Sequence, residues 1–146
     1  MQRILALDLG KKRIGIAVSD PLGLTAQGLP TYERQNRRAD LDHITALMRR
    51  HDVEAAVIGL PLHLSGDGGR QAEHARHFAA ALARHSGVQV ALWDERLTTV
   101  EASRVLRDSG VSLEKRKRAV DRLSAVLILQ NYLDSPEAAK LAATPA

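Results

Sequence analysis

Three acidic segments, far apart in the sequence, each place a carboxylate where it could meet the others. Asp8 lies inside the apolar stretch "RILALDL", and Asp94 and Glu95 end the stretch "VQVALWDE". Asp121 lies near the start of "AVDRLSAVLILQNYL", which would be apolar around most of a helix. Buried carboxylates raise one another's pKa values, and a divalent cation removes that penalty. Because Mg²⁺ and Mn²⁺ prefer oxygen ligands and can activate water, the three segments favour metal-assisted phosphodiester cleavage.

The expected strands decide which of these acids can meet. Ligands collect at the carboxyl ends of the strands in an open α/β sheet, so Asp8 is expected close to Asp94 or Glu95. Side chains alternate across a strand, and therefore only one of these two acids shares the face of Asp8. Each acid also has a purely structural explanation: Asp94 or Glu95 could cap the next turn, and Asp121 could interact with a helix dipole. Asp8 is the hardest of them to explain without a ligand.

Two basic clusters flank the acids. Lys11, Lys12 and Arg13 follow the first acid in a glycine turn, and "EKRKR" at 114–118 closely precedes Asp121. Such side chains hold backbone phosphates and position a scissile bond while reading little base sequence. The clusters therefore favour a nucleic-acid substrate over an ordinary solvated surface.

Other polar stretches carry weaker signals. The glycine-rich "SGDGGR" at 65–70 could receive a phosphate at a helix start, or it could be a mobile surface loop. The arginine-rich stretches at 34–38 and 49–51 are interpreted as solvated surface. Aromatic residues make up only 3% of the chain, which argues against recognition of stacked bases and favours recognition of backbone and shape.

The elements that must position the acids follow from apolar periodicity and turn residues. An N-terminal hairpin with glycine at its turn is expected, and a third strand continues it as a meander. Asp40 is the expected N-cap of the first helix, and Gly87 is expected to end the second. The expected strands are 3–9, 13–19, 24–32, 53–59 and 88–95, and the expected helices are 40–51, 71–87, 98–110 and 119–133. This order predicts a mixed α/β sheet with helices on both faces.

Composition limits the class of protein. The 146 residues, 45% hydrophobic and 26% charged, are typical of one soluble domain. The chain has no cysteine, so a metal site would need oxygen or imidazole ligands. The net charge of +4 and the pI near 9.8 favour an anionic partner. No signal peptide or membrane-spanning run is present, and a cytoplasmic location is therefore expected.

The motifs resemble one known family over roughly residues 3–133. "LALDLGKKRIGIAVSD", "VIGLPLHLSGDGG" with "HARHFAAAL", "WDERLTTVEA" and "KRKRAVDRLSAVLILQNYL" are similar to the YqgF family, also called RuvX, of pre-16S ribosomal RNA nucleases related to Holliday junction resolvases. One departure is Ser124, where the family more often has alanine. The related resolvases also carry a fourth acid in the last helix, and no neighbour of Asp121 supplies one here.

The resemblance implies a ribonuclease H-like fold, a mixed five-stranded sheet flanked by helices. It implies one nuclease domain, which we expect over 1–134, and the composition of residues 135–146 predicts a flexible tail. By position in the motifs, the catalytic and metal-binding acids are Asp8, Glu95 and Asp121, with Asp94 as the alternative to Glu95. The nucleic-acid-binding residues expected around them are Lys11, Lys12, Arg13, Arg70, Arg96, Lys115, Arg116, Lys117 and Arg118.

The function expected from the resemblance is hydrolysis of phosphodiester bonds with two Mg²⁺ or Mn²⁺ ions, at the 5′ side of pre-16S rRNA. The protein would be a monomer or a homodimer. One alternative is a resolvase of four-way DNA junctions, which needs two active sites in a dimer. Another is a non-catalytic nucleic-acid-binding module of ribosome assembly. An actin-like ATPase would share the D-x-G turn at residues 8–10, but such enzymes close two lobes around a nucleotide.

Overall fold

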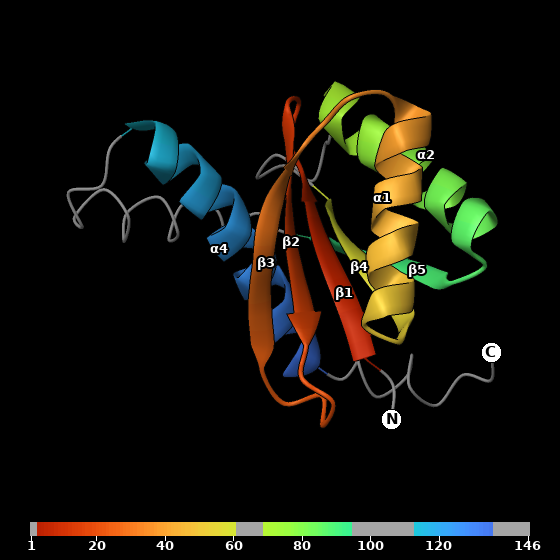
Figure 1. Ribbon diagram of the computed structural model, residues 1–146, viewed down its shortest axis with the longest axis vertical. Coiled ribbons are helices and arrows are strands. Elements are labelled where there is room, and N and C mark those ends of the chain that lie inside the picture. The colour runs from red at the N-terminus through yellow and green to blue at the C-terminus, as the bar shows by residue number, and fades with distance from the viewer. Residues whose placement is uncertain (1–2, 61–68, 95–112, 136–146) are drawn as a thin grey trace.

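One mixed sheet of five strands forms the centre of the molecule (Figure 1). The computed structural model describes residues 3–60, 69–94 and 113–135, and of residues 113–118 and 120 it describes the backbone alone. The strand order is β3-β2-β1-β4-β5. β1 runs antiparallel to β2 and parallel to β4, and β5 is parallel to β4. The strands are β1 Arg3–Leu9, β2 Arg13–Ser19, β3 Ala26–Glu33, β4 Val53–Leu60 and β5 Gln89–Asp94.

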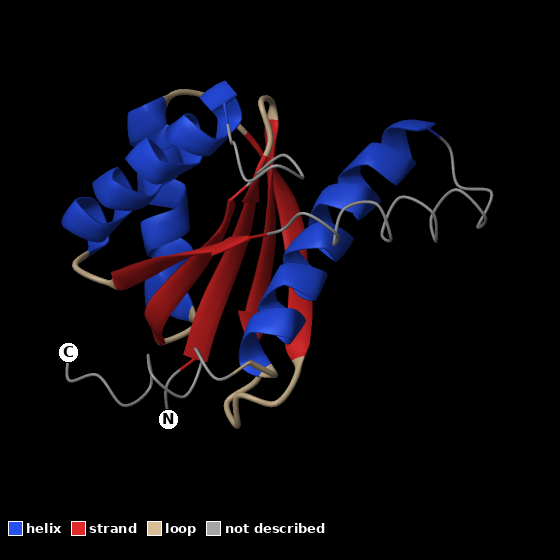
Figure 2. Ribbon diagram, turned by 180° about the vertical axis from the view of Figure 1, so that it is seen from behind, coloured by secondary structure: helices blue, strands red, loops and turns tan. Residues whose placement is uncertain are grey.

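Helices cover both faces of this sheet (Figure 2). α1, Arg37–Arg50, and α2, Gly69–Ser86, pack on one face, and α4, Leu113–Leu133, crosses the other. None of the helices within the described ranges is long and apolar enough to cross a membrane. The predicted mixed sheet with helices on both faces is therefore confirmed.

Alternation along β1 builds two separate cores. Leu5 and Leu7 pack with α1 and α2, whereas Ile4 and Ala6 pack with α4. The main α4 contribution to the second core is Ala125, Ile128, Leu129 and Tyr132. Because β1 is central and covered on both sides, it is apolar at nearly every position. Asp8 continues the row of Ile4 and Ala6, and it is therefore on the α4 face.

Two predicted helix starts are wrong, each for a local reason. α1 begins at Arg37 and not at Asp40, because the side chain of Asn36 accepts a hydrogen bond from the Ala39 N–H and caps the helix one turn earlier. α4 begins at Leu113, six residues before the predicted start, so the basic stretch 114–118 is helical. Charged residues of high helix propensity extend the helix beyond its apolar stripe.

Other predicted boundaries agree with the structure. β1 and β2 have the predicted bounds, and Gly87, with φ +74°, follows the last residue of α2. β3 begins two residues later than predicted. The predicted helix 98–110 lies outside the described residues, as does most of the predicted tail. The division into a domain and a tail stays a prediction.

Candidate active site

Gly15 brings Asp8 and Asp121 to one place. Asp8 and Gly15 are direct partners in the antiparallel β1–β2 ladder, so both face α4. A Cβ atom at Gly15 would overlap the backbone carbonyl of Asp121, which shows that α4 lies against the sheet there. Asp8 and the backbone of Asp121 therefore flank the same glycine, although 113 positions separate them in the sequence.

Arg13, the first residue of β2, holds the Asp121 carboxylate. Asp121 lies on one side of α4 with Ala125, Ile128 and Tyr132, which are buried. Its side chain is 22% exposed, and the Arg13 Nε donates a hydrogen bond to its Oδ2 at 3.0 Å. Burial raises the pKa of Asp121, and the hydrogen bond and charge of Arg13 oppose that rise. A carboxylate in this position gains from any further cation.

Asp94 lies on the other face of the sheet. It pairs with Leu60 in the parallel β4–β5 ladder, and Leu60 packs against the core formed with α1 and α2. The preceding Trp93 packs with the α4 core and contacts the Tyr132 ring edge-on, with 5.5 Å between ring centroids. The register thus separates Asp94 from Asp8. Glu95, the other predicted ligand, lies outside the described residues.

The chemistry of these donors suits a divalent cation. Asp8 and Asp121 offer carboxylate oxygens, which Mg²⁺ and Mn²⁺ prefer. Ser124 follows Asp121 by three residues on α4, and its fully buried hydroxyl has no hydrogen-bond partner within the part of the chain that is described. No group of three or more histidine, aspartate or glutamate side chains in the described ranges could hold a metal. The two carboxylates are therefore not joined by a third such side chain within the described ranges.

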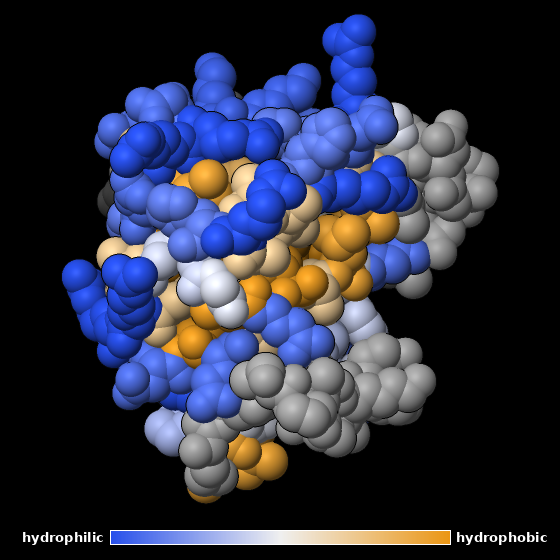
Figure 3. Space-filling model, turned by 90° about the vertical axis from the view of Figure 1, so that its right-hand side faces the viewer, coloured by the Kyte–Doolittle hydropathy of each residue, from blue (hydrophilic) through white to orange (hydrophobic). Residues whose placement is uncertain are grey.

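Basic side chains gather at the same end of the molecule. Lys11 and Lys12 are exposed on the β1–β2 hairpin, and Arg70 is exposed in the first turn of α2. Seen from the side of α2 and β5, hydrophilic residues cover the upper end, where this hairpin and the starts of α1 and α2 lie (Figure 3). Arg13, predicted to bind nucleic acid, is engaged by Asp121. Arg96 and the side chains of Lys115, Arg116, Lys117 and Arg118 lie outside the described part.

A buried ion pair that is absent from the sequence-based predictions supports the hairpin. Arg34 donates from Nε to Asp40 Oδ2 at 3.1 Å and from Nη1 to the Gly10 carbonyl at 3.0 Å. Its backbone N–H donates to the Lys12 carbonyl at 2.8 Å, and its guanidinium lies 5.6 Å from the centre of the Phe78 ring. The interpretation of this stretch as solvated surface is therefore wrong for Arg34, whose side chain is 13% exposed.

One signal for that pair was present in the sequence. Asp40 stands at helical spacing with Ile44 and Met48, which are buried, so a buried carboxylate needing a cation could have been expected there. Asp40 accepts from the Gln35 N–H as well as from Arg34. Burial raises the pKa of Asp40, but the hydrogen bonds from Gln35, Arg34 and Tyr32 outweigh burial and lower it overall. Burial, together with the hydrogen bond to Asp40, raises the pKa of Tyr32 to about 12.

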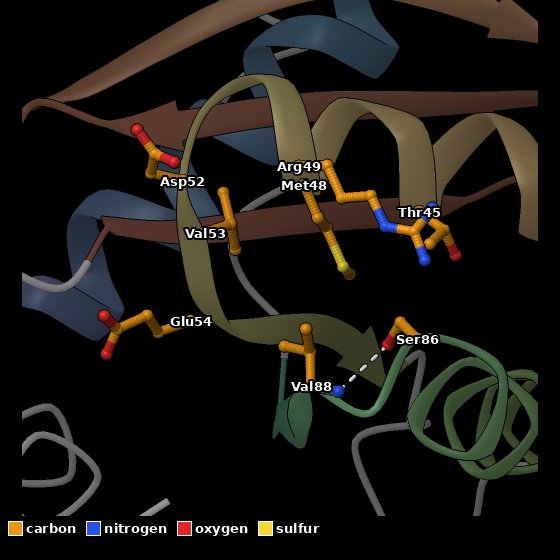
Figure 4. A pocket seen from close by; sticks show the side chains of 8 residues that line it. All are labelled: Thr45, Met48, Arg49, Asp52, Val53, Glu54, Ser86 and Val88. Carbon is orange, nitrogen blue, oxygen red and sulfur yellow. Dashed lines mark hydrogen bonds between the residues drawn. The ribbon is translucent and has the colours of Figure 1, made fainter.

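A cavity of about 340 Å³ lies at the opposite end of the sheet from the acids (Figure 4). It is lined by Val53 and Glu54 at the start of β4 and by Val88 before the start of β5. Ser86 closes one side, where its Oγ accepts from the Val88 N–H at 3.1 Å. Because Asp8 lies at the carboxyl end of β1, which runs parallel to β4, this cavity is remote from the candidate site.

Comparison with known proteins identifies the family. The model of the family described as "RuvX: Holliday junction resolvase" matches residues 2–135. A Koribacter versatilis protein named "Putative pre-16S rRNA nuclease" is 55% identical over 132 residues, which cover 90% of this chain and 86% of the relative. A Halalkalibacterium halodurans protein of the same name is 50% identical over 134 residues, covering 90% and 96%.

Solved structures share the fold at low sequence identity. RuvC from T. thermophilus, in complex with a Holliday junction substrate, has a TM-score of 0.54 at 16% identity, covering 90% of this chain and 94% of the other. Fowlpox virus resolvase, in complex with Holliday junction DNA, has a TM-score of 0.58 at 11% identity, covering 91% and 97%. These likenesses confirm the predicted ribonuclease H-like fold. With a family match along most of its length and relatives half identical to it, the chain belongs to the RuvX family.

Proposed function

We propose that this protein is a divalent-metal-dependent nuclease that hydrolyses phosphodiester bonds in structured nucleic acid. The observation that carries the proposal is the approach of Asp121 to Gly15, the ladder partner of Asp8, at the carboxyl end of a central strand. Two carboxylates on one face, in a fold shared with junction resolvases, suit metal-assisted cleavage.

Asp8, Asp121 and Glu95 are the proposed ligands. Asp94 is the weaker alternative, because the β4–β5 register puts it on the other face of the sheet. Two Mg²⁺ or Mn²⁺ ions, when bound, would activate water and stabilise the leaving oxygen. The chain's own contribution is to hold the carboxylates in place, and Gly15 and Arg13 do this for Asp121.

The basic residues near the acids would hold the substrate. Lys11 and Lys12 lie on the hairpin that follows Asp8, where they can contact phosphates on either side of a scissile bond. Arg70 lies at the start of α2 and would also contact phosphates. Arg96 and the basic residues 115–118 have the same proposed role. Binding through phosphates is salt-dependent and reads little base sequence, so shape would select the substrate.

Pre-16S rRNA is the proposed substrate, with trimming of its 5′ side in the cytoplasm. The relatives named for this RNA are half identical to the chain, whereas the junction-binding structures share only the fold. Cleavage of a four-way DNA junction is the second candidate, favoured by the family description and by those complexes. A monomer suffices for RNA trimming, whereas symmetric junction cleavage requires a homodimer.

A cleavage assay on matched substrates tests the proposal. A pre-16S rRNA fragment and a four-way DNA junction are incubated with the protein in Mg²⁺, Mn²⁺ or EDTA. We expect cleavage of the RNA with either metal and none in EDTA. Removing one ligand carboxylate lowers transition-state stabilisation by several kcal/mol, so Asp8→Asn should lower the rate by roughly a hundredfold or more.

Matched variants make the assay specific. Glu54→Gln removes an exposed acid at the start of β4, at the end of the sheet opposite to Asp8, and this variant should cleave as the wild type does. Glu95→Gln should lose activity and Asp94→Asn should keep most of it. Unchanged cleavage by Asp8→Asn would overturn the proposal, and binding without cleavage in any metal would favour the non-catalytic module. Preferential cleavage of the junction would show that the substrate is branched DNA and not pre-16S rRNA.

A further inference from the structure

A basic pocket lies at the same end of the molecule as the acids but on the face of the sheet that α1 and α2 cover. It has a volume of about 570 Å³ and opens between the β1–β2 hairpin, the start of α1 and α2. The basic side chains that line it are Lys11, Lys12, Arg34, Arg37 and His74. Arg37, Arg34 and His74 belong to none of the residue groups discussed above as substrate-binding.

The charges of the pocket favour an anion. Four permanently charged cations line it, opposed by the carboxylates of Glu33 and Asp40, which leaves a net charge of +2 with histidine neutral. Asp40 does not present a free carboxylate to a ligand. Its Oδ2 accepts from Arg34 and its Oδ1 from the Gln35 N–H, and the residue is 1% exposed.

The walls of the pocket are fixed before any ligand arrives. Arg34 ties Asp40 on α1 to the Gly10 and Lys12 carbonyls of the hairpin. The lysine-bearing hairpin is therefore held at a set distance from the start of α1. A preformed wall lowers the entropy cost of ligand binding.

The surroundings of His74 report the same positive field. Burial lowers the pKa of its ring, and the charges of Arg34, Arg37 and His77 lower it further. These cations belong to three different elements of the fold, since Arg34 follows β3, Arg37 begins α1 and His77 lies on α2. An anion placed among them would reverse the effect on the imidazole ring.

We propose that this pocket binds a backbone phosphate of the nucleic-acid substrate, from a part of the strand that has passed around the β1–β2 hairpin. The inference rests on the proposed function for the identity of the ligand. Lys11 and Lys12 border the pocket and follow Asp8, so they join the two faces. The substrate would then be held on both faces of the sheet, and the tip of the hairpin would lie between two phosphates.

The first test measures anion binding without any cleavage. Inorganic phosphate is titrated into the full chain in EDTA, and the histidine rings are followed by NMR across their titration. We expect phosphate to raise the measured pKa of His74 by roughly 0.5 to 1, as one nearby charge does at a partly exposed site. His51, at the end of α1 far from the pocket, should not respond. An equal or absent response of the two rings would overturn the proposal.

The second test uses neighbouring arginines as a matched pair. Arg37 lines the pocket, whereas Arg38, the next residue of α1, is also exposed but does not line it. Binding of a labelled pre-16S rRNA fragment is measured in EDTA at several salt concentrations. Arg37→Ala should weaken binding roughly fivefold and lower the salt slope by about one, whereas Arg38→Ala should change neither. Equal losses of RNA affinity in the two variants would show a diffuse charge effect and would overturn the proposal of a phosphate site in this pocket.

The two proposals can fail separately. Both binding tests run without metal, so a protein that never cleaves RNA could still bind phosphate through Arg37 and His74. Conversely, Arg37→Ala could bind RNA normally while cleavage still depends on Asp8. That result would support the nuclease proposal and contradict phosphate binding in the pocket.

Discussion

Ser124 carries a buried hydroxyl for which the described residues offer no hydrogen-bond partner. It is fully buried on α4, and no hydrogen bond to its Oγ is found among the described residues. A buried polar group without a partner costs about 1–3 kcal/mol, so Ser124→Ala should raise the free energy of unfolding by roughly 1 kcal/mol. Urea unfolding in EDTA measures the change.

Ser19 provides the control for that prediction. It is equally buried, but its Oγ accepts a hydrogen bond from the Ile4 N–H at 2.8 Å. Ser19→Ala would leave that N–H buried without an acceptor and should lower the free energy of unfolding by about 1–3 kcal/mol. The Ser124 account is wrong if the two variants are destabilised alike.

Asp40 makes stability depend on acid pH. Its pKa lies below the ordinary value of 3.8 in the folded protein. A carboxyl whose folded pKa is lowered contributes stability above its unfolded pKa, and that contribution is lost as the pH falls through the folded pKa. Asp40→Asn should therefore unfold more easily at pH 7 by about 3 kcal/mol, because it leaves Arg34 unpaired.

The comparison across pH identifies the cause. Free energies of unfolding are measured for the wild type and Asp40→Asn between pH 7 and pH 3. The difference between them should be constant near neutral pH and should shrink below about pH 4, where Asp40 of the unfolded chain is protonated. A difference that stays constant down to pH 3 would show that Asp40 acts through packing and not through its charge.

The contact between α4 and the sheet depends on two glycines of different tolerance. A Cβ at Gly15 would meet the Asp121 backbone, whereas a Cβ at Gly28 would meet the flexible side chain of Arg122 at 2.7 Å. Overpacking against backbone costs roughly 1–3 kcal/mol, so Gly15→Ala should be destabilised by that amount. Gly28→Ala should cost less than Gly15→Ala, since the atoms it meets belong to side chains, chiefly that of the exposed Arg122, and not to backbone.

The same pair tests whether helix placement sets the site. Moving α4 away from the sheet would separate Asp121 from Asp8, so Gly15→Ala should also bind Mn²⁺ more weakly than Gly28→Ala does. Thermal unfolding with and without Mn²⁺ gives both quantities, because a ligand of the folded state raises the unfolding temperature. If Mn²⁺ raises it equally in both variants, the site does not depend on the contact at Gly15.

Across the whole molecule, local patterns were predictable and pairings between distant segments were not. The β1–β2 hairpin has the predicted bounds, because apolar runs and a glycine turn specify it locally. The buried side of α4 followed from the helical spacing of Ala125, Ile128 and Tyr132. These features need only the residues within one element.

The missed features depend on contacts between elements. The burial of Arg34 arises from the hairpin, the end of β3 and α1 meeting at one point, which no local pattern contains. Asp40 does not cap α1: its carboxylate accepts from Arg34 and from the Gln35 N–H, and Asn36 caps the helix instead. The side of the sheet taken by Asp94 became known only with the β4–β5 register.

The most direct test of the central claim is a calorimetric titration of Mn²⁺ into the wild type, Asp8→Asn, Asp121→Asn and Glu54→Gln. The claim is that carboxylates from β1 and α4 hold one metal centre. We predict binding to the wild type and to Glu54→Gln with equal affinity, and a loss of roughly tenfold or more in each of the other two variants, since each loses a charged ligand. Wild-type affinity in Asp8→Asn or in Asp121→Asn would contradict the account.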